Sequence, residues 1–563
     1  MVVVLISLLS AMASVAVAQA QSAVNAKPID EASSQRDDSD SLFNAWQNNA
    51  SVRRCGVCHY SPGNDFAPRE TDFCSLTELQ QWLKLDKHSV ARQRIEPIAR
   101  DAQSKATASA QTARSQPGSA KPSQDSIGES NHLSFVILQR LNYDYAKFRE
   151  HCLTCHGGYR LSKEPDGFAL HDIQQPGISC NYCHQSNDNE QWIDEHSGVI
   201  SKAKWRILAP SVKAEKGMLN LVTADAQAQL CYRCHIGDLQ RKMFVTHAMY
   251  AAGHPPLPSV ELDTLIQAMP RHWRSPAELY VSLEEYPLRA AYFETNYPVL
   301  KSLSPDQVRV EQLSWHTDTL VSGAVAAQQQ WIRLVAQAAE STSAYWADYA
   351  LYDCATCHHE LRLPSARQAS RPAGAPGRPR LLEWPQALAR AAAVASGQGD
   401  YLLHLNGQLV QAVKQRPFGQ REAVRRAALQ LDDALEQLKQ QSAAERLSDE
   451  FARKVLVALA QTPEELLLDY HTARQVNWAI RGIDTEFDKS GHALPRNVRA
   501  AIAELGMVPG LTAEFVSTEL AGGPRQPIFP TFVKAELARQ AAYDSLVFVR
   551  QLKAVAESLG IKN

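Results

Sequence analysis

The sequence has no run of basic residues, and its 58 Lys and Arg are offset by 60 Asp and Glu. A net charge of −2 and a pI of about 6.8 do not favour nucleic acid as a partner. Methionine is scarce, with 7 residues in 563, so few thioethers are available as metal ligands. After the N-terminal segment, no stretch is apolar enough to span a bilayer. The chemistry of the chain is therefore expected to lie in its 11 cysteines and 18 histidines.

Ten of the 11 cysteines lie in five copies of one pentapeptide, Cys-x-x-Cys-His, numbered here first to fifth along the chain. The cysteine pairs are Cys55 and Cys58, Cys152 and Cys155, Cys180 and Cys183, Cys231 and Cys234, and Cys354 and Cys357. The histidines that follow them are His59, His156, His184, His235 and His358. This motif is typical of c-type haem attachment, in which both thiols bond to the haem and the imidazole becomes the proximal iron ligand.

Disulfide formation is the alternative for a Cys-x-x-Cys pair in an exported chain, but it does not explain a histidine after every second cysteine. The pattern therefore predicts five covalently attached haem c groups. The eleventh cysteine, Cys74, is predicted to be a buried, inert thiol.

The first twenty residues predict a signal peptide. An apolar stretch from Val2 to Leu9 precedes small residues that end in Ala18-Gln-Ala20, which fits a cleavage site after Ala20. The segment lacks Lys and Arg before its apolar part, so an uncleaved membrane anchor is the alternative. Covalent haem attachment in bacteria takes place outside the cytoplasm, and we therefore predict a periplasmic protein.

Composition divides the rest of the chain into segments. We expect a disordered segment at 21–41, a first haem unit at 42–100, a low-complexity linker at 101–130 and a four-haem domain at 131–370. Residues 381–563 contain no cysteine and are expected to form a helical bundle, which serves either as structural cover or as a docking site for a partner. The predicted fold class is mainly α, an irregular, helix-rich multihaem cytochrome c scaffold followed by this haem-free bundle.

Several helices can be predicted from apolar periodicity and capping residues. Trp331, Val335 and Ala338 fit one helical face, and a second face is formed by Val424, Ala427, Ala428, Leu431, Leu435 and Leu438. Thr462 to Glu465 reads as a capping box that begins a helix with the stripe Leu466, Tyr470, Ala473, Val476 and Ile480. A final helix is predicted from about Val533 to Leu559.

Each proximal histidine leaves one iron position open, and the group that fills it decides the function. A histidine gives a saturated, low-potential electron carrier, a methionine raises the potential, and an open position lets the iron bind small molecules. The residues predicted as second ligands are His88, His196, His247, His254 and His316. Weaker candidates are His132, His151, His171, His272 and His359, together with Met243 and Met249, for which core packing is the alternative.

The surroundings of these motifs resemble the cytochrome c-554 family of multihaem cytochromes over about residues 42–365. The matching segments are Asp86-Lys87-His88-Ser89, Cys152 to Gly158, Gly177 to His184, Trp192 to His196, Cys231 to His235 and Thr246 to Pro255. The resemblance implies a mostly α-helical scaffold with haems in stacked and tilted pairs, periplasmic electron transfer, and distal ligation by His247 and His254. One family member is an electron acceptor for hydroxylamine oxidoreductase. The namesake has four haems and is much shorter, so the long C-terminal segment lies outside the resemblance.

The sequence thus predicts a periplasmic pentahaem c-type cytochrome that relays electrons between redox protein donors and acceptors, rather than an enzyme. One alternative is a catalytic multihaem cytochrome with one open-coordination haem that acts on a small nitrogen or sulfur compound. The absence of a Cys-x-x-Cys-Lys motif weakens a site like that of nitrite reductases. Another alternative is a redox sensor or assembly subunit whose C-terminal segment binds a partner.

Overall fold

The computed structural model describes residues 50–60, 77–93, 95, 133–157, 160–164, 167–171, 177–186, 189–198, 201–273, 287–298, 313–358, 378–440, 443–511, 539–540 and 542–561. The predicted signal peptide, the segment 21–41 and the linker lie outside these residues, as do Cys74, His132 and His359. The described chain is mainly helical, which confirms the coarse fold class. None of its helices combines the length and the apolar character that a membrane crossing requires.

Short helices make up the part of the chain that precedes residue 300, and the first four motifs lie in it. They are α3 (Ala50–His59), α4 (Glu78–Leu85), η1 (Lys87–Val90), α6 (Leu133–Leu141), α7 (Tyr145–His151), α8 (Leu153–His156), α9 (Cys180–His184), α10 (Gln191–Ser197), α11 (Ser201–Arg206), α12 (Pro210–Glu215), α13 (Ala224–His235), η2 (Leu239–Arg241), α14 (His247–Ala252), α15 (Leu262–Ala268) and α17 (Pro287–Asn296). Strands β1 (Arg160–Glu164) and β2 (Gly167–His171) form an antiparallel hairpin.

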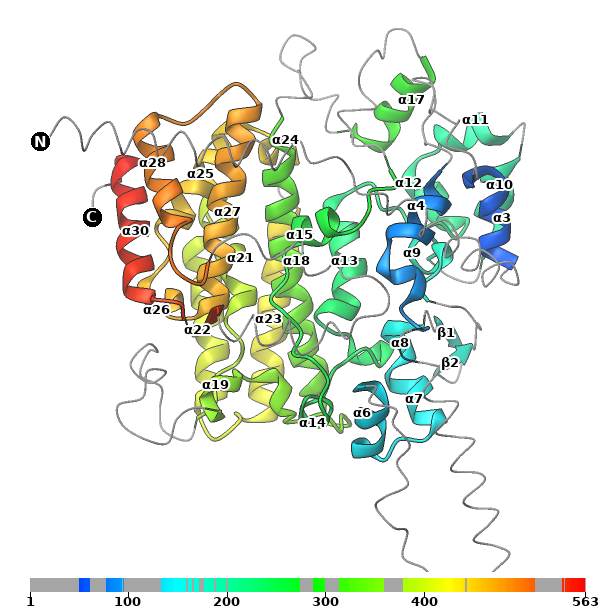
Figure 1. Ribbon diagram of the computed structural model, residues 1–563, viewed down its shortest axis with the longest axis horizontal. Coiled ribbons are helices and arrows are strands. Elements are labelled where there is room, and N and C mark those ends of the chain that lie inside the picture. The colour runs from blue at the N-terminus through cyan, green and yellow to red at the C-terminus, as the bar shows by residue number, and fades with distance from the viewer. Residues whose placement is uncertain are drawn as a thin grey trace, which may run out of the picture.

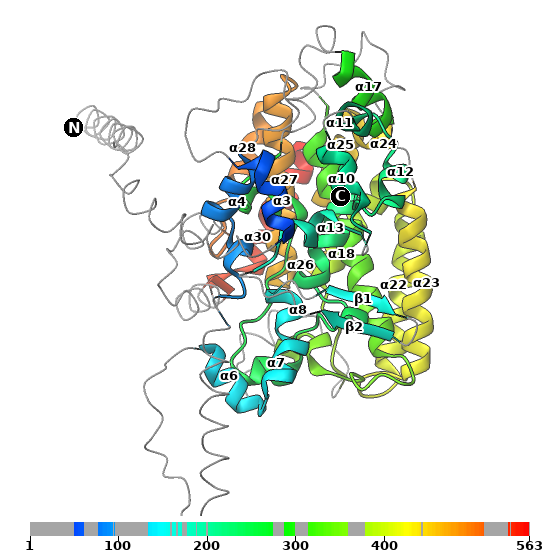
Figure 2. The same cartoon turned by 90° about the vertical axis from the view of Figure 1, so that its right-hand side faces the viewer.

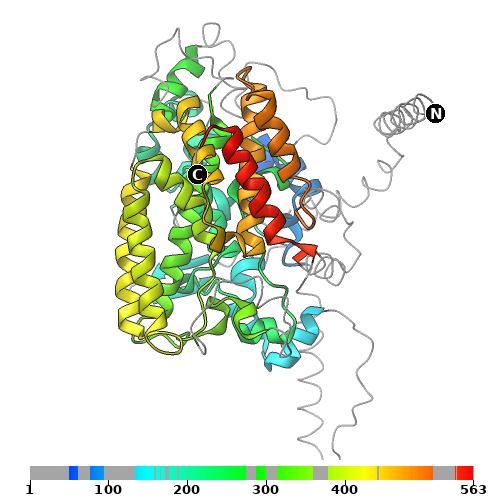
Figure 3. The same cartoon turned by 90° about the vertical axis from the view of Figure 1, so that its left-hand side faces the viewer.

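Longer helices follow. They are α18 (Trp315–Ala338), η5 (Tyr349–Leu351), α19 (Cys354–Cys357), α21 (Trp384–Ala395), α22 (Gly399–Lys414), α23 (Arg421–Lys439), α24 (Ala443–Arg446), α25 (Asp449–Ala460), α26 (Glu464–Leu467), α27 (Tyr470–Lys489), α28 (Arg496–Leu505) and α30 (Ser545–Ser558). In Figure 1, α18 stands between the short helices that carry the first four motifs and most of the C-terminal helices, while α19 lies below α22 on the C-terminal side. Figure 2 shows α22 and α23 side by side along one flank, and Figure 3 shows α30 packed beside α28 on another.

Helix α18 is the centre of the packing, because it contacts α13 and α15 on one side and α21 and α23 on the other. The predicted face of Trp331, Val335 and Ala338 is buried, as expected. Small residues let neighbours approach closely, and a Cβ added to Gly323 would lie 2.6 Å from the Cβ of Leu262 in α15. One hydrophobic core therefore extends from α13 through α18 into the C-terminal helices. Since burying a large aliphatic side chain contributes about 1.5–3 kcal/mol, these helices stabilise one another.

Polar contacts from α27 add to this core. Glu486 accepts hydrogen bonds from the backbone N–H groups of His316, at 2.6 Å, and Thr317, at 3.1 Å, and from the Thr317 hydroxyl. These are first-turn donors of α18 that have no partner within the helix. Arg474 donates to the buried carboxylate of Glu261 at 2.9 Å, just before α15. The C-terminal helices are thus bonded to elements on both sides of the cavity described below.

The helix predictions have mixed outcomes. The six apolar residues predicted for one face of α23 are all buried, which confirms that face. The capping box at Thr462 is wrong, because its hydroxyl donates backwards to the carbonyl of Leu459 at 2.7 Å and the following α26 has a single turn. Asp469 instead caps a new helix, α27, so Leu466 does not belong to the stripe that begins at Tyr470. The predicted final helix is interrupted at Tyr543 and Asp544, because Asp544 caps α30 at Ser545, and its first part, 533–538, lies outside the described residues.

Candidate functional site

Each pentapeptide motif forms a single helical turn or the last turn of a longer helix. The motifs lie at the ends of α3 and α13 and in α8, α9 and α19. The N–H of His156 donates to the carbonyl of Cys152 at 3.0 Å, and that of His358 donates to the carbonyl of Cys354 at 2.8 Å. In such a turn, residues i, i+3 and i+4 share one face, so both thiols and the imidazole can reach one macrocycle. None of the ten motif cysteines forms a disulfide, so the structure does not contain the disulfides that were the alternative.

A second imidazole lies close to the histidine of four of the five motifs. The pairs and their ring-centre distances are His59 and His196 at 6.1 Å, His184 and His272 at 6.3 Å, His235 and His88 at 6.3 Å, and His358 and His247 at 6.2 Å. The two rings are nearly parallel in the first and fifth motifs, at 5° and 24°, and nearly perpendicular in the third and fourth, at 83° and 81°.

These separations fit one metal ion between each pair of rings. An imidazole nitrogen lies about 2 Å from a metal that it ligates and about 1.2 Å from the centre of its own ring. Two imidazoles on opposite sides of one iron therefore have centres about 6.3 Å apart. Aromatic pairs without a metal range over about 4.5–7 Å, so a single pair would decide little. Four pairs between 6.1 and 6.3 Å, each containing a motif histidine, form a repeated arrangement.

The remaining motif histidine, His156, has His254 as its neighbour. Burial lowers the pKa of His156 to about 4, and the charge of His254 is the next largest cause of that decrease. Burial likewise lowers the pKa of His184 to about 4, with His272 as the next cause, and that of His235 to about 4, with His88 as the next cause. These three rings are neutral at pH 7, and a neutral imidazole has the lone pair that a metal requires.

Hydrogen bonds at Nδ1 orient several of these rings. The pairs are His59 with the Glu78 carboxylate at 2.9 Å, His88 with the Asp86 carboxylate at 2.8 Å, and His254 with the Pro255 carbonyl at 2.7 Å. A metal-binding histidine commonly donates its other N–H to a carboxylate or a carbonyl, which fixes the tautomer and leaves Nε2 for the metal. The residues present therefore fit axial ligation of a haem iron.

Local structure explains the position of His254. Gly253 ends α14 with φ at +118°, a conformation that side chains with a Cβ rarely adopt. His254 follows at the end of the helix, next to Pro255, and its backbone N–H donates to the carbonyl of Met249 at 2.9 Å. His247 is the first residue of the same helix, and the Asp348 carboxylate accepts a hydrogen bond from its backbone N–H at 2.9 Å. One short helix thus places second imidazoles at two motifs.

His316 lies in a different environment from the other predicted second ligands. Its Nδ1 is 3.1 Å from the carboxylate of Asp263, and its ring is 5.6 Å from that of Trp478. Its Nε2 is buried against Gly482, where an added Cβ would lie only 2.1 Å away. Backbone therefore occupies the position that a metal would take at this nitrogen. The weaker candidate His272 stands beside His184 instead.

The sequence carried one signal for His272, which is a proline close to the histidine. Pro270 lies two residues before His272, and Pro255 lies directly after His254. Among the other weaker candidates, His151 contacts Tyr143, with ring centres 5.3 Å apart, and the His171 side chain lies outside the described atoms. Met243 and Met249 are buried, in agreement with core packing.

The motifs contact one another in an order that differs from their order in the sequence. The first and third motifs meet through a hydrogen bond between the thiols of Cys55 and Cys180, which is the main cause that lowers the pKa of Cys55 to about 7. The third and fourth meet where the buried hydroxyl of Tyr182 lies 3.9 Å from Sγ of Cys234. The fourth and second meet through a hydrogen bond between the thiols of Cys234 and Cys155.

The second and fifth motifs are connected by Tyr250 in α14. Its ring centre is 6.1 Å from that of His254, and the thiol of Cys354 contributes to the increase in its pKa, which is caused mainly by burial. The spatial order is therefore first, third, fourth, second and fifth. Both ends of this series face solvent, because Cys58 is exposed in the first motif and Cys354 and Cys357 are exposed in the fifth. The cysteines of the three inner motifs are partly buried.

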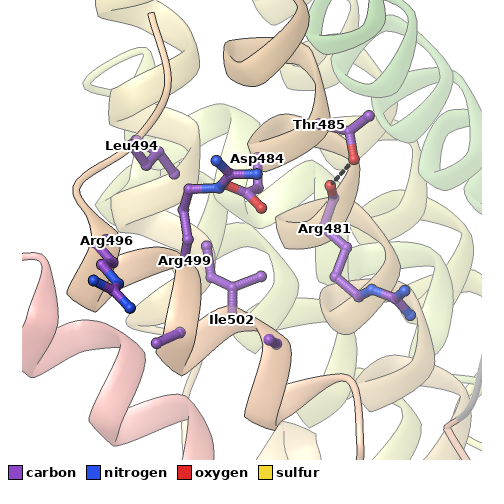
Figure 4. Close-up of a pocket in the computed structure, with 9 residues that line it drawn as sticks. Arg481, Asp484, Thr485, Leu494, Arg496, Arg499 and Ile502 are labelled. Carbon is purple, nitrogen blue, oxygen red and sulfur yellow. Dashed lines mark hydrogen bonds and ion pairs between the residues drawn. The ribbon is translucent and has the colours of Figure 1, made fainter. Parts of the chain in front are cut away.

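Two cavities are lined by residues outside the five motifs. The smaller, of about 600 Å³, is a surface cavity between α27 and α28, lined by Arg481, Asp484 and Arg499 among others (Figure 4). The larger, of about 920 Å³, lies beside His316. Over the described ranges, no cluster of three or more His, Cys, Asp or Glu side chains is arranged to hold a metal ion.

No family model, curated protein or solved structure matches the chain. The resemblance to the cytochrome c-554 family therefore stays a prediction from the sequence.

Proposed function

We propose that the chain is a periplasmic pentahaem c-type cytochrome that relays single electrons between redox partner proteins. The observation that carries this proposal is the pairing of four of the five motif histidines with a second imidazole, at 6.1–6.3 Å between ring centres. The remaining motif histidine, His156, has His254 as its neighbour. When bound, haem supplies a reversible one-electron iron couple whose potential depends on its axial ligands and on burial. The C-terminal helices act as a haem-free bundle that covers the inner motifs.

In this proposal the motif cysteines tether the haems and the motif histidines are the proximal ligands. The distal ligands are His196, His254, His272, His88 and His247 for the first to the fifth motif, respectively. His272 takes the place that the sequence prediction gave to His316. Two imidazoles on each iron leave no position for a small molecule, which favours an electron carrier over a catalytic haem.

The spatial order of the motifs supports a relay with two ends. Electrons would pass from the exposed first motif through the third, fourth and second motifs to the exposed fifth, or in the opposite direction. Next to the ends lie exposed side chains that a partner could contact, Val57 in the first motif, 81% exposed, and Tyr349 beside His247, 54% exposed. The proposed partners are therefore redox proteins that dock at either end.

The proposal can be tested on the exported, haem-loaded protein. Mass spectrometry and the pyridine haemochrome assay should give five haems per chain, and electron paramagnetic resonance of the oxidised protein should show only low-spin iron. As a control, replacing Cys231 and Cys234 by Ala should remove one haem and leave the others. Unmodified motif thiols would refute haem attachment, and a high-spin signal that shifts on addition of cyanide would refute full ligation by histidine.

A further inference from the structure

The larger cavity lies where the motif-bearing half of the chain meets the C-terminal helices. Its walls come from α13, α15, α18 and α27. A volume of about 920 Å³ is in the range of small-molecule sites, which is about 300–1,000 Å³. Aromatic side chains face it from several elements, namely Trp273, Tyr297, Trp315, Tyr470 and Trp478. Such walls favour a flat, unsaturated ring over a small oxyanion, which would leave most of the volume unfilled.

Two cations on α27 distinguish this cavity from an ordinary packing defect. Arg481 and Lys489 line it, and neither side chain forms an ion pair with any residue in the described part of the chain. Other arginines on the same walls are paired, since Arg446 bonds to Asp318 at 2.7 Å and Arg474 bonds to Glu261. A ligand with electron-rich oxygen atoms would gain hydrogen bonds from Arg481 and Lys489.

The cavity also lies one side chain away from a proposed haem ligand. Trp273 lines it, and the Trp273 ring centre is 5.1 Å from that of His272. His272 in turn stands 6.3 Å from His184 of the third motif. In addition, the first turn of α13 lines the cavity, and the last turn of this helix carries the fourth motif. A redox-active molecule in the cavity would therefore be close to two of the proposed haems.

We propose that this cavity binds and oxidises a hydroquinone-class aromatic donor, an inference that rests on the proposed function. With the proposed haems bound in their ferric state, Trp273 and His272 would form the path by which the hydroquinone loses two electrons, one at a time, to two of them. Its two O–H bonds break, the two protons pass to solvent, and the ring leaves as a quinone with two C=O bonds. Arg481 and Lys489 stabilise the negative charge that develops on the oxygen atoms. The C-terminal helices thereby provide one wall of a substrate site, through Trp478, Arg481 and Lys489.

Binding can be measured without electron transfer, by titrating the oxidised, haem-loaded protein with menadione in a calorimeter. Wild type should bind one menadione per chain, and Trp478→Ala should weaken binding about tenfold through the loss of one ring contact. Lys489→Gln is the conservative second variant and should weaken binding several-fold. Lys454→Gln is its matched control, because Lys454 lies on the outside of α25, paired with Glu450 at 2.9 Å, and does not line the cavity. Wild-type affinity in both cavity variants would overturn the proposal.

Electron delivery is then measured by mixing the oxidised protein with menadiol and following haem reduction. The rate should saturate with menadiol in wild type and in Lys454→Gln, and it should become slower in Trp478→Ala and Lys489→Gln. Reduction by dithionite should be equal in all four proteins. A protein with five haems that dithionite reduces, but that does not bind menadione, would refute this site and leave the proposed relay intact. A protein without haem would refute the relay, while calorimetry would still report on the cavity.

Discussion

The choice between His272 and His316 as the distal ligand of the third motif gives the sharpest prediction. His272 has its ring centre 6.3 Å from that of His184, whereas Nε2 of His316 is buried against Gly482. His272→Ala should leave the third-motif iron with a single histidine, five-coordinate and high-spin. Because the chain has five motifs, about one fifth of the total iron should change its spin state. His316→Ala should leave all the iron low-spin.

Electron paramagnetic resonance of the two oxidised variants measures this difference directly. Addition of imidazole to His272→Ala should restore the low-spin signal, because the free ligand can occupy the space left by the side chain. His316→Ala should instead lower the free energy of unfolding by about 1–3 kcal/mol, since Asp263 loses its buried partner. A high-spin fraction of one fifth in His316→Ala, or none in His272→Ala, would refute the assignment.

Three further predictions concern stability, each measured by urea unfolding of the full chain. Gly482→Ala should lower the free energy of unfolding by about 1–3 kcal/mol, because the new Cβ meets His316. Gly407→Ala is the control, because its new Cβ has no atom within 4 Å, and it should raise the free energy of unfolding by about 0.5–1 kcal/mol. Equal effects of the two substitutions would contradict the described packing. Glu486→Ala should lower the free energy of unfolding by about 1–2 kcal/mol, because the first-turn N–H groups of α18 lose the carboxylate that accepts their hydrogen bonds. An unchanged unfolding midpoint would show that Glu486 does not stabilise the start of α18. Burial lowers the pKa of Lys213 to about 8, so the unfolded chain holds this proton more tightly than the folded protein does, and the free energy of unfolding of wild type should rise relative to that of Lys213→Met between pH 8 and 10.5.

Local features could be predicted from the sequence because they depend on neighbouring residues. The spacing of Val424 to Leu438 identified the buried face of α23, and the spacing of Trp331, Val335 and Ala338 identified part of the buried face of α18. The pairing of imidazoles could not be predicted in the same way. His272 meets His184 only because chain segments far apart in the sequence fold together, and no periodic pattern encodes that approach. The segment from Thr462 to Glu465 is a second example. Its residues match a capping box, but the Thr462 hydroxyl bonds to the carbonyl of Leu459 and does not cap the following α26.

The loss of cysteines near residue 380 suggested a domain boundary, but the packing shows one hydrophobic core on both sides of that point. Helix α18 precedes that point, but its buried side chains belong to the same core as α21, α23 and α25. The sequence therefore indicated where cysteines end, not where a structural unit ends. Helix α13 belongs to this core as well, through Ala228 and Tyr232, and it carries the fourth motif.

This shared core has a consequence for the maturation of an exported chain. A polypeptide that crosses a membrane with its N-terminus first presents the fourth motif before α21 and α25 have emerged. Helix α18 then lacks the surfaces that bury it, and α13 has no finished partner on which to dock. Cys231, which lies against the core in the folded protein, would stay within reach of the haem-attachment machinery during this interval. If the chain is exported and loaded with haem as proposed, the late emergence of the C-terminal helices would delay packing of the core until the haems are attached.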